Sequence, residues 1–132
     1  MKVKFLSVLI SILWIPLSII GQAIGKLAAE FLYGFNLYAN MPDFMKISGP
    51  TILSGIAGGY LAGYIVTKIY KKLDWRFAAV LPSIFTALMV GAGVYVHIAN
   101  DLRLMDTIPL LLAHIAALVT YVYVTKEKQN DF

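Results

Sequence analysis

Residues 54–64 read SGIAGGYLAGY, a run that holds four glycines and two alanines and carries no charge. In a helix exposed to water, each glycine costs roughly 1 kcal/mol relative to alanine, so the run is poorly suited to a soluble helix. In a lipid bilayer, helices associate by close van der Waals contact, which small residues permit. The run therefore indicates a membrane helix that packs closely against a neighbour.

The composition of the whole chain agrees with a membrane protein. Of its 132 residues, 60% are hydrophobic and only 14% are charged, whereas a soluble domain is about half apolar and about a quarter charged. The charges separate four long apolar windows, each near the ~20 residues that a helix needs to cross a bilayer. We predict one all-α domain over 1–132, a compact bundle of four transmembrane helices. Its spans are expected at 5–25, 48–69, 76–99 and 107–125, with the outer connection 26–47 partly helical or interfacial.

Lysine and arginine are distributed unevenly between the two ends of this bundle. Eight of the eleven fall in the N-terminal tail, the 68–76 loop and the C-terminal tail. The positive-inside rule then predicts a multi-pass protein of the plasma (inner) membrane with both termini in the cytoplasm. The first span also resembles a cleaved signal peptide in its basic tip, but its length, Trp14 and Pro16 favour a retained helix.

The basic residues also bear on partners. Lysines at a cytoplasmic face serve topology and contact anionic lipid, so the net charge of +4 requires no nucleic acid. The predicted partners are membrane lipid and either a second copy or another membrane protein.

Small residues follow one another at four-residue steps in the second span. They are Thr51, Gly55, Gly59, Gly63 and Thr67. The third span has a comparable series, Ala79, Ser83, Ala87 and Gly91. Folding the chain about the 68–76 loop predicts that these two series pack together, with Gly59 near Ala87. In an alternative interpretation, the small residues and hydroxyl groups line a conduit for a solute.

Two histidines stand near the outer ends of the last two spans. Asp101 follows His97 by four residues, and the hairpin places His114 about one turn deeper than His97. Together with Asp106 they form a candidate polar site for a metal or for protonation. The alternative places His97 in water and His114 in a hydrogen bond to a neighbouring helix. Because the ligand spacing is loose, we predict no bound metal and no cofactor.

Motifs for catalysis are missing. The sequence has no H-E-x-x-H, no G-x-S-x-G, no phosphate-binding glycine loop and no cysteine. We therefore predict no enzyme, but a membrane protein that acts through helix–helix packing, as a homo-oligomer or as a subunit of a larger complex. The alternatives are a small passive channel or transporter, and a metal- or pH-responsive protein that uses the outer histidines.

Overall fold

The computed structural model describes residues 2–33, 43–102 and 104–130, and every element in this part of the chain is helical. In chain order the elements are α1 (Lys2–Ile10), the 3₁₀ turn η1 (Ser11–Leu13), α2 (Trp14–Tyr33), α3 (Asp43–Ile69), α4 (Trp75–Ala78), α5 (Val80–Asn100) and α6 (Leu104–Asn130). Four segments are long and apolar enough to cross a membrane: Lys2–Phe31, Gly49–Ile69, Trp75–Asn100 and Thr107–Lys128. The predicted all-helical class and the four membrane-length helices are confirmed within the described residues.

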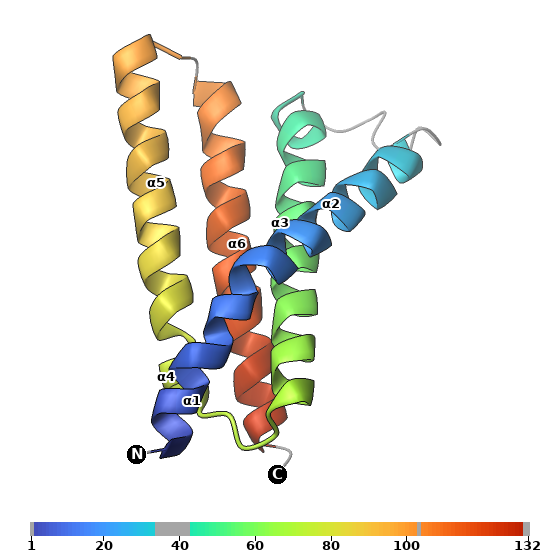
Figure 1. The fold of residues 1–132 in the computed structure, drawn as a ribbon. Helices are drawn as coiled ribbons and strands as arrows, with labels where there is room; N and C mark the ends of the chain where they lie inside the picture. The colour runs from blue at the N-terminus through green and yellow to red at the C-terminus, as the bar shows by residue number, and fades with distance from the viewer. Residues whose placement is uncertain (1, 34–42, 103, 131–132) are drawn as a thin grey trace.

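The first of these segments is bent rather than straight. Pro16 has no N–H to donate to the carbonyl of Ile12, four residues earlier, so a regular helix is disfavoured there. The chain forms the 3₁₀ turn η1 at this point, and α2 leaves in a direction different from that of α1 (Figure 1). The bend allows α1 to contact α4 while α2 packs along α3.

The connection predicted over 26–47 is helical where the structure describes it. Helix α2 continues to Tyr33 and α3 begins at Asp43, so Pro50 lies inside a helix. Residues 34–42 of this connection lie outside the described part.

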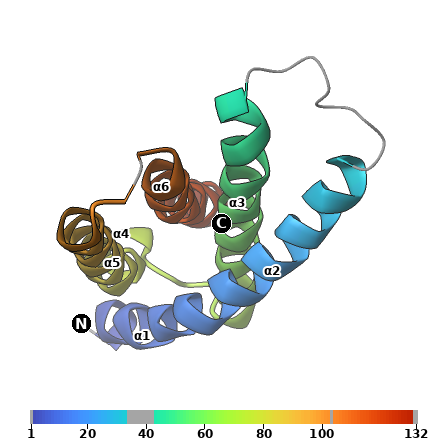
Figure 2. The same cartoon turned by 90° about the horizontal axis from the view of Figure 1, so that it is seen from above.

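Helix α3 is the central helix of the bundle. Seen from above, it lies between α2 and α6, and α5 lies on the far side of α6 (Figure 2). The predicted pairing of the second and third spans, α3 and α5, is therefore wrong. The cause lies in the connection after α3, which buries Leu73 and then forms α4 before α5 begins. This detour starts α5 beyond α6 instead of beside α3.

Aromatic side chains hold the helices together near the end that carries both termini. Trp14 of α2 and Tyr121 of α6 are 1% and 0% exposed. The Trp14 ring meets Phe85 of α5 edge-on at 5.6 Å between centroids, and the Tyr121 hydroxyl donates a hydrogen bond of 3.0 Å to the carbonyl of Ala78. Side chains of α2, α5 and α6 thus meet at one point, and Tyr121 joins α4 to them.

Candidate functional site

The glycine series of α3 lies directly against α6. A Cβ added to Gly55 or Gly59 would collide with the carbonyl oxygen of Ala113 or Ala117, respectively. At Gly63 an added Cβ would lie 2.9 Å from the Cβ of Val124. The predicted contact between Gly59 and Ala87 is wrong, because α6 occupies that face of α3.

A second face of α3 packs against α2. A Cβ added to Gly21 would lie 2.6 Å from the Cα of Gly58, and one added to Gly25 would lie 2.7 Å from the Cβ of Ala57. This contact was not predicted, although Gly21 and Gly25 have the same four-residue spacing as the α3 series. Helix α3 is therefore in backbone-close contact on two sides, which explains why its glycines are so numerous.

The predicted small-residue series of α5 faces away from the bundle. Ser83, Ala87 and Gly91 are exposed, and a Cβ added to Gly91 meets no atom within 4 Å. The buried residues of α5 are instead Pro82 and Thr86. Each is the chain neighbour of a predicted packing residue, so the packed face is rotated by about 100° from the predicted one.

Ala79 and the two threonines of the predicted series lie at helix ends or edges. Ala79 is half-buried between α4 and α5, and Thr67 is buried near the end of α3. The Thr67 hydroxyl donates to the carbonyls of Gly63, at 2.8 Å, and Tyr64, at 3.0 Å. Thr51 is half-buried at the other end of α3.

His97 is paired with Thr107 rather than with Asp101. Its Nδ1 lies 2.8 Å from the Thr107 hydroxyl oxygen, which ties α5 to α6. Helix α6 already begins at Leu104, so Thr107 lies inside the helix rather than at its start. Asp101 ends α5 in the left-handed conformation, with φ 50° and ψ 47°.

The remaining members of the candidate polar site do not form a metal centre in the described part of the chain. No group of three or more His, Cys, Asp or Glu residues is close enough to hold an ion there. The side chain of Asp106 lies outside the described residues. His114 is half-buried and lines the same cavity as Thr107, but it takes no part in the His97–Thr107 hydrogen bond.

His114 lines two cavities on either side of α6. One, of about 310 Å³, lies between α5 and α6 and is mainly apolar. The other, of about 220 Å³, lies between α2, α3 and α6. Its polar lining comprises Gln22, Lys26, Thr51, Ser54 and His114. Gln22 and Lys26 are four residues apart on one face of α2, and this spacing was the available sequence signal for the second cavity.

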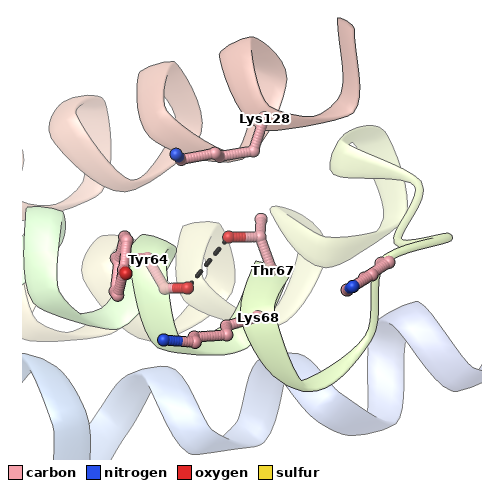
Figure 3. A pocket seen from close by; sticks show the side chains of 5 residues that line it. Tyr64, Thr67, Lys68 and Lys128 are labelled. Carbon is pink, nitrogen blue, oxygen red and sulfur yellow. Dashed lines mark hydrogen bonds between the residues drawn. The ribbon is translucent and has the colours of Figure 1, made fainter. Parts of the chain in front are cut away.

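A third hollow lies at the opposite end of the bundle, between the ends of α3 and α6 (Figure 3). It has a volume of about 170 Å³ and is lined by Tyr64, Thr67, Lys68, Lys71 and Lys128. Three ammonium groups around one small hollow can bind an anion. The predicted role of these lysines is in topology, and they were not predicted as a site. Comparison with known protein families, characterised proteins and solved structures finds no match to this chain.

Proposed function

We propose that this is a non-enzymatic, multi-pass protein of the plasma (inner) membrane that works by associating with a second copy of itself through α5. The observation that carries the proposal is the outward face of α5. Ser83, Ala87 and Gly91 lie exposed on that face. By contrast, Gly21 of α2 and Gly55 and Gly59 of α3 lie against the backbone of a neighbouring helix.

The physical argument rests on how helices associate in lipid. Apolar area alone gives them little reason to pair, but a groove of small residues lets two backbones approach closely. Bulky side chains border the groove: Ile84 and Leu88, one position along from Ser83 and Ala87, are 52% and 67% exposed. Tyr95, the next residue after Gly91 at the same four-residue step, is 73% exposed and ends the groove. No charged residue occurs between Val80 and Asn100. The face is therefore suited to pairing with a copy of itself across a two-fold axis.

The orientation of the bundle is part of the proposal. Both termini and the loop between α3 and α4 lie at one end (Figure 1). That end carries eight of the eleven lysines and arginines, which supports placing it in the cytoplasm. Two copies inserted in this common orientation bring their α5 helices together in parallel.

The association is tested by disulfide trapping, because the chain contains no cysteine. An Ala87→Cys variant in its native membrane is expected to form a covalent dimer under mild oxidation. Val119→Cys, on the exposed face of α6, is the matched control and should remain monomeric. Equal trapping at both positions, or a disulfide-free Ala87→Cys monomer, would contradict self-association. Capture of a different membrane protein through residue 87 would replace it with the subunit role.

A passive path for small polar solutes is the second candidate, favoured by the polar cavity between α2, α3 and α6. On the side of Ser54 nearer the chain termini, the backbone of α3 packs against α2 at Gly58 and against α6 at Gly59. These contacts close the path in this conformation. Swelling of protein-containing liposomes in glycerol measures solute flux through this path. If the protein acts by association alone, we expect no more swelling than in protein-free liposomes. Swelling that Ser54→Leu abolishes would favour the path.

A further inference from the structure

We propose that the hollow between the ends of α3 and α6 binds the phosphate group of an anionic lipid. Its walls come from two helices and from the turn after α3. Lys68 and Thr67 belong to the last turn of α3, Lys71 to the following turn, and Lys128 to α6 (Figure 3).

The hollow carries a surplus of positive charge. Lys68 and Lys128 direct their ammonium groups at the same ring, at 5.4 and 5.5 Å from the centroid of Tyr64. Within the described residues, neither ammonium group has a carboxylate partner. A tyrosine face attracts cations but does not neutralise them.

The negative C-terminal ends of α3 and α6 offset only part of this positive charge. Each helix C-terminus is equivalent to about half a negative charge, so the two ends offset about one of the three lysines. About two positive charges remain, and they repel each other unless an anion enters the hollow. A phosphate group supplies that anion, and ammonium groups bind its oxygens with charge-assisted hydrogen bonds.

Within residues 2–33, 43–102 and 104–130, the acidic residues near the hollow do not fill this role. The carboxylate of Asp74 accepts a hydrogen bond from the backbone N–H of Arg76 and caps α4. Glu127 is exposed on α6 and does not line the hollow. A neighbouring hollow of about 510 Å³ shares Lys71 and adds Lys2 and Lys72, which extends the basic surface.

A nearby apolar groove favours a lipid over a free phosphate ion as the ligand, because it can hold an acyl chain. This groove lies between α2 and α3, has a volume of about 400 Å³, and is lined by side chains that include Ile24, Leu53 and Tyr60. The Tyr60 ring stacks on Tyr64, with centroids 6.4 Å apart and an interplanar angle of 11°. A headgroup in the basic hollow and an acyl chain in the groove therefore meet at a common pair of tyrosines.

The position of the hollow along the membrane-length helices also suits a lipid headgroup. The two membrane-length segments that form it end at Ile69 and Lys128. Headgroups occupy the level at which spanning helices end, and basic pockets between helices at the cytoplasmic side bind anionic headgroups. Thr67 forms a wall rather than a donor, since its hydroxyl donates to carbonyls of its own helix.

The test counts lipids retained by the purified protein in a neutral detergent, by native mass spectrometry. Phosphatidylglycerol is titrated against phosphatidylcholine of the same chain length. We expect the wild-type chain to retain phosphatidylglycerol selectively and the Lys68→Gln/Lys128→Gln variant to bind it roughly 25-fold more weakly, since each lysine near an anionic headgroup contributes about fivefold. Lys68→Arg/Lys128→Arg, which keeps both charges, should restore retention.

Lys4→Gln/Lys126→Gln is the matched control. These lysines lie over Phe77 and Trp75, so the control removes the same charge and the same type of ring contact outside the hollow. Its binding should fall by less than about fivefold. Equal losses in both double variants, or equal retention of the two lipids by the wild-type chain, would overturn the site. Displacement of the lipid by an equal concentration of glycerol phosphate would overturn the lipid assignment in favour of a soluble phosphate.

Discussion

At the scale of single residues, the same amino acid has opposite roles at different positions. Gly59 is in contact with the backbone of α6, whereas Gly49 has no atom of another helix within 4 Å of an added Cβ. Hydroxyls differ in the same way: that of Tyr121 donates to the Ala78 carbonyl, and that of Thr86 is buried without a partner among the described residues. Two pairs of substitutions exploit these contrasts.

Gly59→Ala is expected to lower the free energy of unfolding by about 1–3 kcal/mol, because the added methyl group meets a backbone carbonyl that cannot move independently. Gly49→Ala is the control, and it should change stability by less than about 1 kcal/mol, because the gain in helix propensity is opposed by the contact of its Cβ with the ring of Pro50. Thermal unfolding in detergent measures both. A fully tolerated Gly59→Ala would mean that α3 and α6 are further apart than described.

Tyr121→Phe removes a hydroxyl that pairs with a buried carbonyl, so we expect a loss of about 1–3 kcal/mol in stability. Thr86→Val removes an unpaired buried hydroxyl at nearly constant shape, so its effect should be zero or stabilising. The same unfolding assay compares the two. Equal destabilisation by both substitutions would show that Thr86 has a partner.

At the scale of helices, the sequence predicted the number of membrane-length segments because charge and hydropathy are local properties. It also identified the small-residue face of α3. It did not identify the partner, since Ala113 and Ala117 of α6 offer a small face as readily as Ala87 of α5 does. Adjacent spans were assumed to pair, and the detour through Leu73 and α4 overrides that assumption.

The α5–α6 hairpin offers a test of the histidines. His97→Ala and Thr107→Val should each cost about 1 kcal/mol, and the double variant should cost little more than either, because both remove the same hydrogen bond. Zinc at one equivalent should leave the melting temperature unchanged. Stabilisation by zinc that His97→Ala and His114→Ala both abolish would favour the metal site considered from the sequence.

At the scale of the whole molecule, orientation and association depend on features that the sequence displays only in part. The charge bias is visible along the chain, and its location at one end of the bundle follows from the helix order (Figure 1). The outward direction of Ser83, Ala87 and Gly91 was not predictable, because a rotation of one residue decides whether a face points inward.

Reporter fusions test the orientation. A reporter at the C-terminus and one inserted after residue 71, which is exposed, should both indicate the cytoplasm. One inserted at residue 102 should indicate the opposite side, because eight basic residues lie at the terminal end. A C-terminal reporter on the outer side is incompatible with the proposed orientation.

The mass of the protein in a mild detergent, measured by sedimentation, tests the proposed association most directly. Pairing through α5 requires the wild-type chain to sediment at twice the 14.6 kDa chain mass, excluding detergent. Ala87→Ile fills the exposed groove without touching the rest of the bundle, so it should sediment as a folded monomer. A wild-type monomer, or a dimer that Ala87→Ile leaves intact, would contradict association through α5.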